Sequence, residues 1–252
     1  MTTAAQDPKR QFPAAAHPTP ARVLTLDAAR FLAAWRDLNG PEAPAVRPYL
    51  GCPDREAWAT YHEALATRCD ARWQPRTREL EVDFTRVQVA SYTLIRRDGR
   101  VLAYTRSKGG DARLSLRRSI GVGGHVEPRD DAYAGNFGFL FAGGPVQEVA
   151  AACAWRELCE EIGGDARILP TVPRVRAYIY DPSDDVGRVH LGVVCVSDAP
   201  PGWEPITNGE ILSHCWVTPE PVLAAPPGEW ESWSVHLARA LATPDGTGWR
   251  SL

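Results

Sequence analysis

One long helical segment with strand-rich segments on both sides limits the folds open to this chain. Residues 145–162 carry apolar side chains at helical spacing, with Pro145 at the start and the Gly163-Gly164 pair at the end, where helices favour these residues. Before it, residues 82–106 contain two β-rich runs joined by Asp98-Gly99, which predicts a hairpin. After it, we expect strands at 174–180, 188–196 and 210–218 and an amphipathic helix at 230–242. This order predicts an α/β (α+β) sandwich, with a mixed sheet between helices.

The N-terminal third has a different pattern. Residues 1–20 are rich in proline and alanine, which predicts a flexible tail. Residues 26–38 and 54–68 repeat apolar side chains at helical spacing, so we expect an N-terminal helical region over 21–80. The main domain is then expected over 81–252.

Charge and composition exclude several classes of protein. The net charge of −3 over 252 residues lacks the broad basic excess that nucleic-acid backbones and anionic membranes select. The six cysteines form no CxxC pair, and no apolar run approaches the roughly 20 residues that span a bilayer. We therefore expect a cytoplasmic protein with no membrane association and no stable nucleic-acid partner.

Three glutamates crowd the end of the central helical segment. Glu157, Glu160 and Glu161 share about one third of the helix circumference, where they repel one another and the helix dipole. A hard divalent ion such as Mg²⁺ or Mn²⁺ would relieve this repulsion, because it takes carboxylate oxygens readily. The alternative is an acidic helix end that simply faces solvent.

The residues around these glutamates favour the metal site. The string R-E-L-C-E-E-I-G at 156–163, with Glu148 eight positions before Arg156, resembles the signature of the Nudix hydrolases. That signature reads Gly, five residues, Glu, seven residues, then Arg-Glu-aliphatic-any-Glu-Glu-any-Gly-aliphatic. The final aliphatic position is occupied by Gly164.

The glycine that opens the signature is displaced. Residues 121–125, GVGGH, resemble the glycine-rich entry to the motif in a Nudix branch described as predicted phosphoesterases. On this alignment Glu127 is the usual loop acid, and 23 residues separate Gly124 from Glu148 where the family has five. The loop would thus carry an insertion of 18 residues.

The resemblance implies a Nudix-like α/β/α sandwich and a Nudix-type phosphohydrolase, acting as a pyrophosphohydrolase with Mg²⁺ or Mn²⁺. It would hydrolyse a diphosphate linkage in a nucleoside diphosphate-X or a related nucleotide. Glu157, Glu160, Glu161 and the backbone carbonyl of Gly123 would be metal ligands, and Arg156 would hold the glutamates in place. The general base varies across the family, so Glu210, Asp184, Asp185 and a glutamate of the motif are all candidates.

Candidate substrate contacts come from charge placement. Residues 96–129 contain nine basic side chains and three acidic ones, so Arg106, Lys108 and Arg118 could bind phosphates. His125 could approach a phosphate or satisfy a hydrogen bond at a strand end. Aromatic side chains of the insertion could stack on a base, pack on the sheet or contact a homodimer partner.

Two other functions remain open at this point. A Nudix-like module could bind a nucleotide without hydrolysing it and act as a regulatory module, which the displaced glycine and the insertion would allow. Alternatively, the N-terminal helices could make this an interaction protein with a vestigial catalytic domain. The sequence does not identify the substrate.

Overall fold

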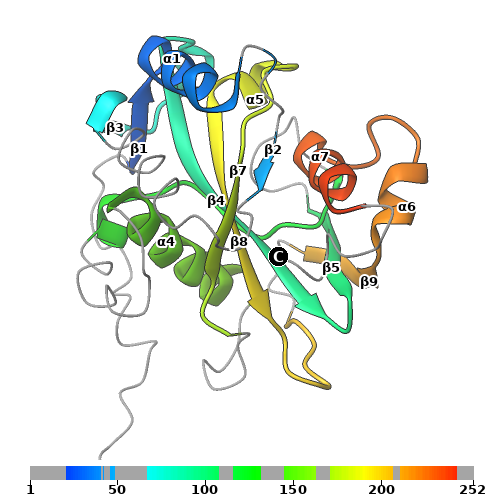
Figure 1. Cartoon of the computed structure of the whole chain (residues 1–252). Helices are drawn as coiled ribbons and strands as arrows, with labels where there is room; N and C mark the ends of the chain where they lie inside the picture. Colours follow the sequence, from blue (N-terminus) through cyan, green and yellow to red (C-terminus); the bar gives the residue numbers. More distant parts are fainter. Residues whose placement is uncertain are drawn as a thin grey trace, which may run out of the picture.

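A mixed β-sheet forms the centre of the molecule (Figure 1). The computed structural model describes residues 21–40, 42, 46–48, 67–107, 116–131, 145–162, 171–206 and 211–242. Among these residues, nine strands join one sheet. They are β1 (Arg22–Asp27), β2 (Val46–Pro48), β3 (Arg72–Pro75), β4 (Arg86–Arg97), β5 (Arg100–Arg106), β6 (Arg118–Ser119), β7 (Arg174–Ile179), β8 (His190–Asp198) and β9 (Ile211–Val217).

Strand β4 organises this sheet. The strand order is β2-β7-β8-β4-β1-β3, and β5, β6 and β9 extend from the end of β4. β4 pairs in parallel with β8 and antiparallel with β1, and its first ten residues are buried, as expected for a strand covered on both faces. The predicted hairpin is confirmed, because Asp98 and Gly99 turn between β4 and β5 with φ of 50° and 72°.

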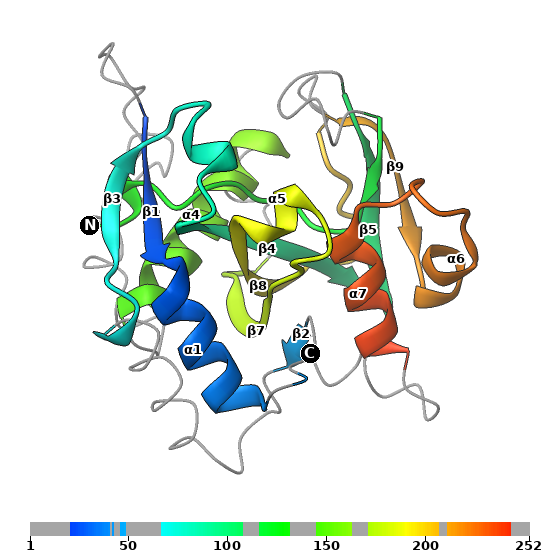
Figure 2. The same ribbon diagram turned by 90° about the horizontal axis from the view of Figure 1, so that it is seen from above.

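Helices cover both faces of the sheet, and Figures 1 and 2 show α4 and α7 on opposite sides of β4 and β8. The helices are α1 (Ala28–Asn39), α4 (Pro145–Glu161), α5 (Asp185–Arg188), α6 (Pro219–Ala224) and α7 (Ser232–Leu241), and the 3-10 turn η2 spans Leu80–Val82. Apolar residues of α1 and α4 pack with Val87, Val89 and Leu191 in one core. Those of α7 pack with Leu94 and Val194 in another. The predicted sandwich is thus confirmed.

The N-terminal region contributes more than helices. Helix α1 begins two residues after the start of the predicted 26–38 segment and ends one residue beyond it, with the Asp27 carboxylate accepting a hydrogen bond from the Arg30 amide as its N-cap. Directly before it, β1 pairs with both β3 and β4, so residues 21–80 also supply strands to the main sheet. The second expected helix and the tail lie outside the described residues, except for Thr67 and Arg68, which are helical.

None of the helices in the described part of the chain is both long enough and apolar enough to cross a membrane.

Candidate active site

A cavity of about 300 Å³ lies where the glycine-rich segment 121–125 runs beside β4. Its wall combines residues from the middle of β4, the glycine segment, the second half of α4, the α5 turn and the start of α7. The residues that line it are Arg76, Glu81, Ala90, Ser91, Tyr92, Arg106, Arg117, Gly123, Gly124, His125, Glu127, Glu157, Glu161, Asp184, Val186, Gly187, His190, Glu231, Ser232 and Trp233.

Gly123 and Gly124 let the backbone approach both β4 and α4. The Ser91 amide donates a hydrogen bond of 2.9 Å to the Gly124 carbonyl, which anchors the segment on β4. A Cβ at Gly123 would lie 2.1 Å from the Ser91 carbonyl oxygen, and one at Gly124 would lie 2.4 Å from Glu157 Oε1. Any side chain at these positions would therefore displace either the strand contact or the Glu157 carboxylate.

The three glutamates of α4 divide into two groups. Glu157 and Glu161 lie one turn apart, are buried, and line the cavity. Glu160 does not line it; its side chain is 41% exposed and its Oε1 lies 3.1 Å from Arg129 Nη1. The structure thus brings two of the expected metal-ligating carboxylates to the cavity beside Gly123 and places the third at its rim.

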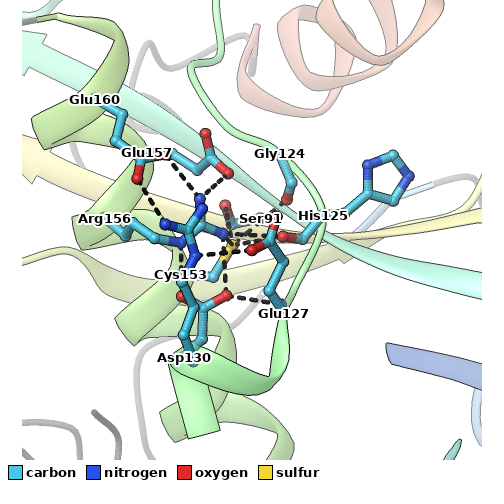
Figure 3. Close-up of polar contacts among 10 residues, drawn as sticks. Ser91, Gly124, His125, Glu127, Asp130, Cys153, Arg156, Glu157 and Glu160 are labelled. Atoms are coloured by element: carbon cyan, nitrogen blue, oxygen red, sulfur yellow. Dashed lines mark hydrogen bonds and ion pairs between the residues drawn. The ribbon is translucent and has the colours of Figure 1, made fainter. Parts of the chain in front are cut away.

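Arg156 is the centre of the charge network behind these glutamates (Figure 3). Its guanidinium is fully buried and donates two hydrogen bonds to Asp130, of 2.7 and 3.0 Å. The same guanidinium donates to Glu157 at 2.5 Å, to Glu160 at 3.0 Å and to the His125 carbonyl at 3.0 Å. Arg156 therefore ties α4 to the segment that follows the glycines, and it sets the position of two glutamates.

The partner of Arg156 corrects the sequence alignment. Asp130, and not Glu148, contacts Arg156, and Asp130 follows Gly124 after five intervening residues, as the signature requires of its first acid. The insertion therefore lies between Asp130 and Arg156, where 25 residues replace the seven of the signature. An aspartate in place of the signature's glutamate hid this match in the sequence, whereas Glu148 fitted the later spacing.

Burial makes the anionic form of Glu157 unfavourable. It raises the pKa of Glu157 to about 7, with Glu160 and Asp130 adding to the rise and Arg156 partly offsetting it. A cation in the cavity would remove this penalty. Carboxylate oxygens are hard donors that suit Mg²⁺ or Mn²⁺, so the residues present fit the ion that the sequence implied.

The expected cationic residues have different positions. Arg106 lines the cavity, where its guanidinium pairs with Glu231. Arg118 does not line it; Arg118 stacks over Trp230 with Cζ 4.1 Å from the ring centroid and pairs with Glu229 at 3.2 Å. Lys108 lies outside the described residues.

The candidate general bases also differ in their position relative to the cavity. Asp184 lines the cavity and accepts a hydrogen bond of 2.7 Å from the Gly187 amide. Asp185 does not line it and lies 3.6 Å from Arg188. Glu210 lies outside the described residues.

The cavity also contains residues that the sequence reasoning missed. His125 lines it as expected, but its ring points away from Arg156 (Figure 3) and meets His190, with the two Nε2 atoms 3.1 Å apart. Burial, His190 and nearby arginines hold the pKa of His125 well below its usual value. Trp233 was also missed, because only the fold brings it beside the glycines, whereas Arg117 belongs to the basic segment 96–129 but was not chosen among its phosphate contacts.

The fold is similar to that of a solved Nudix-family structure. The crystal structure of the Nudix-family protein Tm1382 superposes with a TM-score of 0.58 at 21% identity, covering 87% of this chain and 97% of that one. The NUDIX hydrolase from Alicyclobacillus acidocaldarius superposes with a TM-score of 0.44 at 16% identity, covering 64% of this chain and 95% of that one. The MutT NUDIX hydrolase from Burkholderia pseudomallei superposes with a TM-score of 0.38 at 18% identity, covering 62% of this chain and 98% of that one.

A comparison with curated protein sequences finds no match. The family model described as NUDIX domain matches residues 85–239, which is more than half of the 252 residues and includes both glycines, Asp130 and the glutamates of α4. The chain therefore belongs to the Nudix family.

Proposed function

We propose that this protein is a metal-dependent pyrophosphohydrolase that cleaves a diphosphate linkage in a nucleoside diphosphate-X or a related nucleotide. Nudix membership supports hydrolysis of this general kind. The observation that carries the proposal is that Glu157 and Glu161 lie with Gly123 and Gly124 on the wall of a cavity that also contains arginines.

In this proposal the glutamates of α4 hold one or more Mg²⁺ or Mn²⁺ ions. Glu157 and Glu161 supply carboxylate oxygens, Gly123 supplies its backbone carbonyl, and Glu160 joins them by exchanging its contact with Arg129. A bound ion would supply positive charge to neutralise the diphosphate and to lower the pKa of an attacking water. Arg156 keeps the glutamates in position from behind.

Arginines at the cavity provide phosphate contacts. Arg117 makes no ion pair with any described residue, so its charge is available to a phosphate oxygen. Arg106 is partly neutralised by Glu231, and we assign it a weaker role, together with Lys108. Trp233 offers an aromatic face on which a nucleobase could stack.

Asp184 is our candidate for the general base among the described residues. It lines the cavity on the α5 turn, and its side chain is already oriented by the Gly187 amide. Glu210 is a second candidate, proposed from the sequence alone.

The test measures phosphate-product release from a panel of nucleoside diphosphate and triphosphate derivatives with Mg²⁺ or Mn²⁺. We expect metal-dependent cleavage by the wild type and a loss of at least about 100-fold in Glu160→Gln and Glu161→Gln, since each removes a carboxylate that would hold the metal ion. Glu148→Gln is the matched control, because Glu148 is on the same helix but does not line the cavity. It should retain wild-type rates.

Two outcomes would contradict the proposal. Wild-type rates in both Glu160→Gln and Glu161→Gln would show that neither residue contributes to the reaction. Nucleotide binding without turnover across the panel, with the metal bound, would instead identify a Nudix-like regulatory module.

A further inference from the structure

A second group of metal-ligating side chains lies in the same cavity, apart from the glutamates of α4. It consists of Glu81, His125 and His190, whose ligand atoms all lie within 4.8 Å of one another. The two Nε2 atoms are 3.1 Å apart, and Glu81 Oε2 is 3.9 Å from His190 Nε2. None of these residues belongs to the glutamate-rich part of the motif.

The sheet itself brings the two histidines together. Ala90 of β4 pairs antiparallel with His125 on one side, and Gln88, two residues earlier, pairs in parallel with His190 on the other. Residues paired across strands share a face, as do residues two apart on one strand. Both imidazoles therefore lie on the face that carries Ala90, whose methyl group is small enough to let them meet.

The hydrogen bonding of His190 prepares its Nε2 for a ligand. His190 Nδ1 lies 2.7 Å from the Val186 carbonyl oxygen. A carbonyl only accepts, so Nδ1 carries the proton and, in the neutral ring, Nε2 presents its lone pair. A backbone carbonyl that orients the second ring nitrogen in this way is the usual support of a metal-ligating histidine.

The distance between the two nitrogens also fits a shared ion. Two imidazole nitrogens bound roughly 2.0–2.1 Å from one ion would be about 2.8–3.4 Å apart at octahedral to tetrahedral angles. The 3.1 Å separation found here falls in that range, so His125 and His190 need little movement. Glu81 would approach by a small shift of its partly exposed side chain.

A polar group beside the cluster supports a ligand there. Gln88 is fully buried on the same sheet face as His190, and neither its Oε1 nor its Nε2 has a hydrogen-bond partner among the described residues. Leaving both atoms of a buried amide unsatisfied is costly. Water bound to an ion at the histidines could satisfy them.

We infer that Glu81, His125 and His190 form a second metal site, selective for a borderline transition-metal ion such as Zn²⁺. Two imidazoles and one carboxylate make a donor set that suits Zn²⁺ and leaves a fourth position open toward the cavity. The all-oxygen set on α4 suits Mg²⁺ or Mn²⁺ instead. The site goes beyond the proposed hydrolysis, because ion binding there does not require turnover.

The test is calorimetric titration of the metal-free full chain with Zn²⁺, in buffer containing excess Mg²⁺ to occupy the glutamates of α4. We expect one tight Zn²⁺ equivalent in the wild type and a rise in melting temperature on binding. Removing a ligand should weaken binding at least about 100-fold in His190→Gln, His125→Gln and Glu81→Gln, more than the loss of a supporting partner causes. His214→Gln is the matched control, since His214 pairs with Glu204 outside the cavity.

Cobalt provides a second readout. Co²⁺ bound to the wild type should give the visible absorption bands of a low-symmetry site with nitrogen and oxygen ligands. The Glu81→Gln substitution should change these bands. If the histidine variants do not fold, Glu81→Gln decides the matter alone, because Glu81 is partly exposed. The inference is overturned if Zn²⁺ does not bind beyond the Mg²⁺-occupied site, or if Glu81→Gln binds Zn²⁺ as tightly as the wild type.

Discussion

At the scale of single residues, Arg156 determines how the candidate site is built. A buried guanidinium is stable only when its donors are satisfied by acceptors of opposite charge, and here Asp130, Glu157 and Glu160 provide them. The arginine and the α4 glutamates could be recognised from the sequence by their spacing. Asp130 was hidden because it replaces the glutamate of the signature, and His190 could not be recognised because its partner His125 is far away in the chain and is brought to it by the fold.

The Asp130–Arg156 contact leads to a first prediction. Asp130→Asn removes one buried charge and leaves Arg156 with an uncompensated donor, so it should destabilise the protein by about 3 kcal/mol, the lower end for breaking a buried ion pair. Glu148→Gln at the first turn of α4 should cost less than about 1 kcal/mol. Urea unfolding of both variants measures the difference, and equal midpoints would show that Asp130 is not the structural partner of Arg156.

At the scale of elements, local patterns predicted α4, α7 and the β4–β5 hairpin with ends within a few residues. These elements have clear periodicity and end signals such as Pro145 and Asp98-Gly99. Strand β1 was missed because its four buried residues run directly into α1, and a short apolar run before a helix is not distinguishable from the helix itself. Its identity as a strand comes from pairing with β3 and β4, which is tertiary information.

Helix α7 is attached to the sheet by a contact that should depend on pH. Burial alone would raise the pKa of Asp181, but hydrogen bonds from His236 and Ser183 and the charge of His236 outweigh it and hold the pKa below its usual value. The folded pKa is therefore below the unfolded value of about 3.9. This contribution is present above about pH 4 and is lost as pH falls further.

The lowered pKa of Asp181 leads to the second prediction. In the wild type, the free energy of unfolding should decrease by about 1–3 kcal/mol below pH 4 through this group, the size of a hydrogen bond to a charged partner. His236→Leu should be less stable than the wild type at pH 6 and should show a shallower decrease in acid. Thermal unfolding at several pH values checks this, and parallel acid profiles would contradict it.

At the scale of the whole molecule, the N-terminal region and the Nudix part share one sheet. Strand β1 pairs with β4, and α1 packs into the same core as α4. The proposed boundary at residue 81 therefore marks where the part of the chain with the motif begins, and it does not divide the chain into separable folding units.

A third prediction is that a fragment of residues 81–252 will not fold like the full chain. Without β1, the hydrogen-bonding edge of β4 and the apolar side of Val87 and Val89 become exposed, which favours aggregation. A fragment of residues 21–252 should melt like the full chain. Near-ultraviolet circular dichroism during heating compares the three proteins, and a cooperative transition of 81–252 at the full-chain temperature would show that the sheet does not need β1.

The buried ion pair between Asp130 and Arg156 has a consequence for how such a chain can diversify. It holds together the two halves of the motif that the insertion separates, so the length of the intervening chain matters little to the chemistry. Lengthening the intervening chain from seven residues to 25, part of which forms the first half of α4, adds at most about 1 kcal/mol of closure entropy. Selection could thus rewrite this segment while Arg156, its acidic partners and the candidate site that they hold are inherited unchanged.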